Sequence, residues 1–331
     1  MRISVLGAGS WGTTVASVAA HRNDTILWAR DPDVADHIES ERENARYLAG
    51  FALPSRLHAS ADLEKVVAVA DVLIVGIPSH GFRDVLVQAK AHLRPWVPVV
   101  SLTKGFENGT LLRMTEIIKE VLPGHPAAAL SGPNLAKEIM AGHAAASVIA
   151  TDDLQVAKAL QGVLHRGLFR VYTNHDVVGC EVGGALKNVI AIAAGMAEGL
   201  SVGDNTRAAV ITRGLAELTR LGVAMGGEPL TFSGLAGLGD LVATCSSPQS
   251  RNRYVGEQLG RGHTLADILA EMNTVAEGVK TARLAMELAE RFGVRMPISS
   301  YIHSVIEGRA TAADIYEGLL RERPGREVDP N

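Results

Sequence analysis

A lysine in an apolar helical stretch is the residue of this sequence best suited to proton transfer. Lys187 lies within the segment Ala185–Ala191 among small and apolar residues, and Asn188 follows it. Burial disfavours an ammonium ion, so we expect this lysine to release its proton more readily than an exposed one. Such an amine can take a proton from a hydroxyl group during hydride transfer, or return one to a developing alkoxide. The alternative is a structural lysine whose stem packs while its head reaches solvent.

Two further polar segments follow predicted strands. Lys104 comes just after one strand, and Gly132 and Asn134 lie where another strand passes into a helix. Ligands of open parallel sheets bind at the carboxyl ends of the strands, where a lysine, an amide side chain and free backbone N–H groups can all donate hydrogen bonds. A solvated loop lysine and a simple helix cap are the alternative interpretations.

A third segment has the pattern of a phosphate site. Ser250 is a predicted helix N-cap, with Arg251 and Asn252 in the first turn. A helix N-terminus favours anions, so an arginine there opposes the helix dipole unless a ligand compensates. The pattern favours a phosphate ester as ligand, and a solvent-facing cap is the alternative.

A glycine-rich turn indicates a dinucleotide cofactor. Gly7, Gly9 and Gly12 form G-x-G-x-x-G between the predicted strand Ile3–Leu6 and a helix. The first glycine permits the tight turn, the second lets a pyrophosphate approach the backbone, and the third lets helix and strand pack closely. This context makes dinucleotide binding the prediction.

The end of the second predicted strand bears on the choice between NAD and NADP. An acid there binds the ribose 2′-hydroxyl, whereas an arginine accommodates a 2′-phosphate. The chain offers both, Arg30 and then Asp31. We expect Arg30 to contact the 2′-phosphate or adenine, so that NADP is accepted and NAD is not excluded.

Composition excludes several classes of protein. The 331 residues carry a formal net charge of −4, which argues against a nucleic-acid-binding protein. The longest near-apolar stretches, Val66–Pro78 and Val189–Ala197, fall short of the ~20 residues that span a bilayer, so we expect no integral membrane segment. Two cysteines, Cys180 and Cys245, cannot form a disulfide framework, and a reduced cytoplasmic protein is expected. No histidine or cysteine spacing suggests a metal site.

The predicted elements change character along the chain. Apolar strands alternate with helices up to about residue 175, which predicts a Rossmann-like, mostly parallel doubly wound sheet. Beyond this point only helical patterns remain. We therefore expect a dinucleotide-binding domain at residues 1–177, an all-helical substrate domain at 178–320 and a flexible tail at 321–331. The predicted strands are Ile3–Leu6, Thr25–Trp28, Val72–Val75, Val97–Ser101, Ala127–Leu130, Ala145–Ala150 and Leu168–Tyr172.

Seven motifs in this order resemble the biosynthetic NAD(P)-dependent glycerol-3-phosphate dehydrogenases of bacteria, over roughly residues 1–320. They are Gly7–Thr13, Thr103–Phe106, Ser131–Pro133, Lys187-Asn188, Gly234–Leu241, Ser250–Asn252 and Ala276–Gly278. The resemblance implies an α-helical C-terminal domain like that of 6-phosphogluconate dehydrogenase. It also implies reduction of dihydroxyacetone phosphate to sn-glycerol 3-phosphate for phospholipid synthesis.

The resemblance also assigns roles. Lys187 is the implied proton-transfer residue, and Asn134 stands where the family often has Ser or Thr. The implied substrate-binding residues are Lys104, Gly132, Asn134, Lys187, Asp240, Ser250, Arg251 and Asn252. The implied dinucleotide contacts, beside the three glycines, are Ser10, Trp11, Arg30, Lys104, Ala136, Arg251, Val275 and Glu277.

Two other functions remain open at this stage. A related dehydrogenase for a β-hydroxy acid or ketopantoate would share the two-domain plan, but its substrate carboxylate would not need the Ser250–Asn252 turn. A non-catalytic NAD(P)-sensing protein would keep the glycine turn without needing Lys187. The sequence does not fix the oligomeric state, and a homodimer is one option.

Overall fold

The computed structural model describes residues 1–272 and 276–321 and divides into two compact units, Met1–Glu181 and Val182 onward. The division falls inside one long helix, α9 (Val177–Gly199), where the sequence predicted a boundary between residues 177 and 178. Of the predicted tail, Arg321 is the last residue of helix α17 (Ala312–Arg321), and residues 322–331 lie outside the described part.

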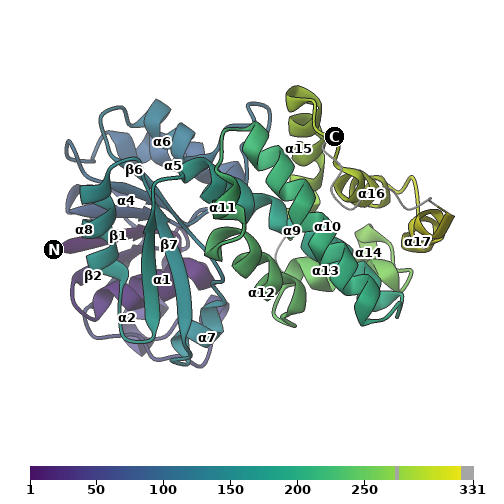
Figure 1. Cartoon of the computed structure of the whole chain (residues 1–331). Helices are drawn as coiled ribbons and strands as arrows, with labels where there is room; N and C mark the ends of the chain where they lie inside the picture. Colours follow the sequence, from purple (N-terminus) through teal and green to yellow (C-terminus); the bar gives the residue numbers. More distant parts are fainter. Residues whose placement is uncertain (273–275, 322–331) are drawn as a thin grey trace. The chain divides into compact units, whose positions relative to one another are not determined.

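An eight-stranded sheet forms the centre of the first unit (Figure 1). Its order is β3-β2-β1-β4-β5-β6-β7-β8, and every neighbouring pair is parallel except β6–β7. The predicted Rossmann-like class is therefore confirmed. The strands are β1 (Arg2–Leu6), β2 (Asp24–Trp28), β3 (Leu57–Ser60), β4 (Val72–Val75), β5 (Val99–Ser101), β6 (Ala127–Ser131), β7 (Ala145–Ala150) and β8 (Phe169–Asn174).

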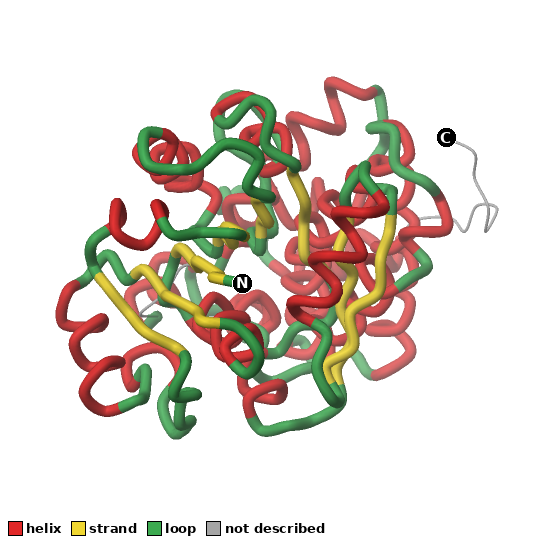
Figure 2. Tube along the Cα trace, turned by 90° about the vertical axis from the view of Figure 1, so that its left-hand side faces the viewer, coloured by secondary structure: helices red, strands yellow, loops and turns green. Residues whose placement is uncertain are grey.

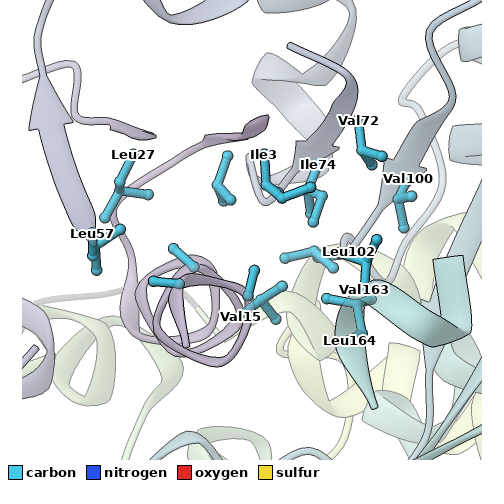
Figure 3. Close-up of a cluster of buried hydrophobic side chains, with 14 of the residues drawn as sticks. Ile3, Val15, Leu27, Leu57, Val72, Ile74, Val100, Leu102, Val163 and Leu164 are labelled. Carbon is cyan, nitrogen blue, oxygen red and sulfur yellow. The ribbon is translucent and has the colours of Figure 1, made fainter. Parts of the chain in front are cut away.

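Helices cover both faces of this sheet, because the central strands are apolar on both sides. Ile3 and Ile74 pack into one core with helices α1 and α8, as Figure 3 shows, while Leu73 and Val75 pack into a second core with α5 and α6. The helices of this unit are α1 (Ser10–Ala20), α2 (Pro32–Glu41), α3 (Ala45–Leu48), α4 (Leu63–Ala68), α5 (Ser79–Lys90), α6 (Met114–Val121), α7 (Ala136–Met140) and α8 (Leu154–Leu164).

Strand β3 was not predicted. It has four residues and pairs only with β2 at the edge of the sheet, and of its residues only Leu57 is buried. A short edge strand with His58 and Ser60 lacks the β-branched, alternating pattern by which strands are recognised in a sequence.

The described residues of the second unit contain helices and no strand. Figure 2 draws the helices of the molecule in red and its strands in yellow. Helical patterns in the sequence predict five of these helices and miss α11, the π-helical turn η1, α12, α16 and α17. The five predicted segments are Gly179–Leu200, Thr206–Leu221, Arg251–Leu259, Leu265–Met272 and Val279–Phe292. After α9 come α10 (Asp204–Ala224), α11 (Pro229–Phe232), η1 (Leu235–Gly239), α12 (Asp240–Ser246), α13 (Arg251–Gly260), α14 (Leu265–Glu271), α15 (Glu277–Phe292), α16 (Pro297–Ile306) and α17.

Helix α9 is 23 residues long and, by length and composition, apolar enough to cross a membrane. The sequence underestimated the apolar length of this helix, because Glu181 and Lys187 interrupt its apolar runs. In the structure 94% of its most apolar window is buried, which is typical of a core helix in a globular protein.

Helices α9 and α13 pack with their backbones in direct contact. A Cβ atom on Gly195 would lie 2.0 Å from the carbonyl oxygen of Arg253, and one on Gly256 would lie 2.0 Å from that of Ile192. Gly199 and Gly260 make the same kind of approach one turn further along. Only glycines allow this spacing, which packs α13 along the C-terminal part of α9.

We expect Gly256→Ala to lower the free energy of unfolding by about 1–3 kcal/mol, because the new methyl group would overlap a backbone carbonyl. The matched control is Gly162→Ala on α8, where a Cβ would meet nothing within 4 Å. A helix-interior glycine with open space should gain about 0.5–1 kcal/mol on substitution by alanine. Urea unfolding of the two variants measures both effects, and equal shifts would contradict the backbone-contact argument.

Candidate active site

The glycine turn has the geometry that a pyrophosphate requires. Gly7 has φ +108°, and a Cβ there would lie 2.6 Å from the carbonyl oxygen of Gly76. A Cβ on Gly12 would lie 1.9 Å from the oxygen of Gly7, so strand and helix pack at glycine distance. A Cβ on Gly9 would meet nothing within 4 Å, which leaves the loop open in front of the α1 N-terminus. The residues present therefore fit a dinucleotide.

Two of the other predicted cofactor contacts in this turn are already engaged by the protein. Ser10 donates its hydroxyl hydrogen bond to the carbonyl oxygen of Tyr47 at 2.5 Å. The Trp11 ring packs edge-on against Phe169 with centroids 6.4 Å apart, and its Nε1 is buried without a partner in the described chain. The part of Trp11 suited to a phosphate is thus its backbone N–H in the first helical turn, rather than its ring.

Lys104 and Gly132 meet beyond the carboxyl ends of β5 and β6. The Lys104 amine donates to the carbonyl oxygen of Gly132 at 2.9 Å. Gly132 has φ +126°, and a Cβ there would lie 3.1 Å from the Cα of Ser147 on β7. A side chain at this position would be strained and crowded, so the glycine allows the close approach of lysine, turn and strand.

The sequence missed a residue that holds Asn134. The Ser147 hydroxyl, fully buried on β7, donates to the Asn134 side-chain oxygen. The Asn134 Nδ2 atom is buried and has no partner among the described residues, and the same holds for the nearby Ser131 hydroxyl. Unpaired buried donors are costly, so these groups are suited to a polar ligand.

The second unit holds Lys187 in a buried ion pair. Its amine donates to the Asp240 carboxylate and, at 2.6 Å, to the Thr244 hydroxyl. Lys187 is 6% exposed and Asp240 is 1% exposed. The amine therefore faces a carboxylate rather than the apolar surroundings that the sequence suggested. Thr244 was missed, although it lies one helical turn after Asp240, where both side chains share a helix face.

A π-helical turn directly precedes Asp240 and positions it beside Lys187. The turn η1 ends at Gly239, and α12 begins directly with Asp240. A Cβ on Gly183 of α9 would lie 2.8 Å from the carbonyl oxygen of Ala236, so the turn packs on the helix that carries Lys187. Turns of this rare kind are frequent at functional sites.

A chain of amides joins three helices next to Lys187. Asn252 donates from its side chain to the Asn188 side-chain oxygen at 2.9 Å, and it accepts from the backbone N–H of Gly278 at 2.9 Å. Asn252 is 9% exposed. Both ends of its amide are thus fixed, and α9, α13 and the start of α15 are held together around it.

The start of α13 was predicted correctly. Ser250 is the N-cap, and its hydroxyl accepts from the backbone N–H of Arg253 at 3.2 Å. Arg251 is exposed, whereas Asn252 is buried. Of the predicted dinucleotide contacts, Glu277 is half-buried as the first residue of α15, and Val275 lies outside the described residues.

The remaining two predicted cofactor contacts lie beside strand ends and loops of the first unit. Arg30 is exposed two residues after β2, and Ala136 is the half-buried first residue of α7.

Cysteine chemistry is not part of this site. Burial raises the pKa of the Cys245 thiol to about 12 and raises that of Cys180 as well, so both stay protonated at neutral pH. Within residues 1–272 and 276–321, no group of three or more His, Cys, Asp and Glu side chains could hold a metal ion.

We expect Asp240→Asn to lower the free energy of unfolding by about 3–5 kcal/mol, because it leaves a buried lysine without its counter-charge. The double variant Lys187→Met/Asp240→Asn removes both charges and should recover a large part of that loss. Urea unfolding of the wild type, of Lys187→Met, of Asp240→Asn and of the double variant measures the coupling energy between the two side chains. Additive losses would show that the two groups do not interact.

Comparison with known proteins gives the family. The models of the N- and C-terminal parts of NAD-dependent glycerol-3-phosphate dehydrogenase match residues 2–157 and 176–317. A protein of Sphingopyxis alaskensis named glycerol-3-phosphate dehydrogenase [NAD(P)+] 2 is 57% identical over 100% of this chain and 99% of its own. A Mycobacterium avium protein named glycerol-3-phosphate dehydrogenase [NAD(P)+] is 54% identical over 99% of this chain and 96% of its own.

A solved structure agrees with these sequences. The crystal structure of glycerol-3-phosphate dehydrogenase from Coxiella burnetii superimposes with a TM-score of 0.93 at 36% identity, over 97% of this chain and 99% of that one. The fold, the ordered motifs and these similarities agree, and the chain belongs to the NAD-dependent glycerol-3-phosphate dehydrogenase family of oxidoreductases.

Proposed function

We propose that the protein catalyses the reversible NAD(P)-dependent reduction of dihydroxyacetone phosphate to sn-glycerol 3-phosphate, which supplies glycerophospholipid synthesis. The observation that carries this proposal is the buried cluster of Lys187, Asp240 and Thr244. Lys187 is followed on α9 by Asn188, whose side chain binds Asn252 at the start of α13. The names of the 57% and 54% identical relatives support the same reaction.

The reduction needs a hydride and a proton. A nicotinamide cofactor, when bound, would supply the hydride. The Lys187 amine, held by Asp240 and Thr244, gives the proton to the carbonyl oxygen, which becomes the hydroxyl group of the product. In the reverse direction the same amine takes that proton back.

The phosphate of the substrate belongs, in this proposal, at the start of α13. Ser250, Arg251 and Asn252 offer a capping hydroxyl, an exposed guanidinium and a fixed amide at a helix N-terminus. Lys104, Gly132 and Asn134 orient the rest of the substrate, with the unpaired Asn134 Nδ2 as a donor. The proposed dinucleotide contacts are Gly7, Gly9, Ser10, Trp11, Gly12, Arg30, Lys104, Ala136, Arg251, Val275 and Glu277.

The proposal also includes a cytoplasmic location and a homodimer. Two buried thiols without a disulfide suit a reducing compartment. Analytical ultracentrifugation tests the dimer directly. We retain residues 1–177 and 178–320 as the proposed functional domains.

Lys187→Ala should lower kcat by about 10²–10⁴-fold, because the reaction loses its proton donor. NADPH oxidation followed by absorbance with dihydroxyacetone phosphate measures kcat, and NADPH fluorescence should show near-normal cofactor binding. Lys187→Arg is the control, since it keeps the charge pair but holds its proton too tightly to transfer it. A Lys187→Arg variant with wild-type kcat would contradict the proton-transfer role.

Arg251→Ala should raise the KM for dihydroxyacetone phosphate by about 10–100-fold, because the substrate phosphate loses a charge-assisted hydrogen bond. The change in kcat should be smaller. Unphosphorylated dihydroxyacetone is the matched substrate, and its low kcat/KM should not change. Equal losses with both substrates would argue against a phosphate contact. Wild-type turnover of ketopantoate instead of dihydroxyacetone phosphate would overturn the proposed substrate, and NADPH binding without any turnover would favour a sensing protein.

A further inference from the structure

The acid that follows β2, Asp31, is bound by two groups of the protein itself. One Asp31 carboxylate oxygen accepts from the backbone N–H of Asp33 at 3.1 Å and caps α2. The other pairs with the Arg46 guanidinium at 2.6 Å. Each oxygen thus has a partner within the protein, and the Arg46 guanidinium balances the charge of this acid.

Arg46 is held beside the glycine turn. It lies on α3, whose neighbouring Tyr47 accepts the Ser10 hydrogen bond through its carbonyl oxygen at 2.5 Å. The buried Asn44 side chain, at the N-cap of α3, donates to the carbonyl oxygen of Ala8 at 2.8 Å. These bonds fasten α3 to the turn, and the Asp31 pair fastens Arg46 to the end of β2.

In Rossmann domains the adenosine ribose lies between these two places, the glycine turn and the carboxyl end of the second strand. Arg46 and Asp31 pair there, and the exposed Arg30 directly precedes Asp31 in the chain. Their formal sum is +1. A ribose 2′-phosphate carries about −1.5 to −2 near neutral pH, as other phosphate monoesters do, whereas a 2′-hydroxyl is uncharged.

We propose that Arg46 is a specificity-determining residue that favours NADP(H) over NAD(H) by neutralising Asp31 and by offering its guanidinium to the 2′-phosphate. The side chains of the pair are 58% and 44% exposed. The pair is made through one guanidinium nitrogen, Nη1, so Arg46 can offer its other N–H groups to a phosphate while it stays beside Asp31. The inference rests on the dinucleotide-binding part of the proposed function and not on its substrate.

The test is calorimetric binding of adenosine 2′,5′-bisphosphate and of 5′-AMP, neither of which is turned over. Arg46→Ala should lower the affinity for the bisphosphate by at least about tenfold, because a charge-assisted contact to the 2′-phosphate is lost. The affinity for 5′-AMP should stay within about twofold of the wild-type value. Arg22→Ala is the matched control, because Arg22 is an exposed arginine just before the opposite end of β2. It should change neither affinity.

A second variant predicts a gain, which misfolding cannot imitate. Asp31→Asn keeps a good N-cap residue on α2, removes the negative charge and releases Arg46. It should bind the bisphosphate more tightly than the wild type does, with 5′-AMP unchanged. Equal losses of both nucleotides in Arg46→Ala, or no loss, would overturn the inference. A wild type that binds neither nucleotide would instead refute the dinucleotide site.

Discussion

The buried ion pair between Lys187 and Asp240 is the constraint on which the helical unit is organised. A buried charge is tolerated only with a partner at hydrogen-bond distance, so α9 and α12 must hold these groups in register. The π-helical turn before Asp240 and the glycine contacts of α9 maintain that register with backbone rather than side chains. The same helix presents Asn188, one residue on, to the start of α13.

In the first unit, glycines again allow close backbone contacts, and here they shape the loops that follow the strands. Parallel strands end at one edge of the sheet, and the glycine turn, Lys104 and Gly132 all follow such ends. Glycines stand where a Cβ would strike a carbonyl oxygen or a neighbouring strand. Backbone N–H groups can therefore point at a ligand, which suits a charged cofactor whose phosphates need many weak donors rather than one strong one.

The two units also differ in how their polar groups are satisfied. In the helical unit, the side chains of Lys187 and Asn252 already have partners, so their geometry is fixed before a ligand binds. In the sheet unit, Asn134 Nδ2 and the Ser131 hydroxyl are buried without partners in the described chain. Preorganised groups suit proton transfer and orientation, whereas unpaired donors suit recognition, since a ligand that satisfies them gains the most.

Local pattern determined seven of the eight strands, the change to an all-helical second part, the glycine turn and the helix start at Ser250, because these depend on residues close in sequence. It missed β3, η1 and α12, which are short and lack a clear period, and it missed Thr244 and Ser147, which matter only through distant partners. Only the tertiary structure decided that Lys187 faces a carboxylate, that the Trp11 ring packs in the core and that Asp31 is bound by Arg46. Each of these joins groups from different elements, and no spacing along the chain encodes such a meeting.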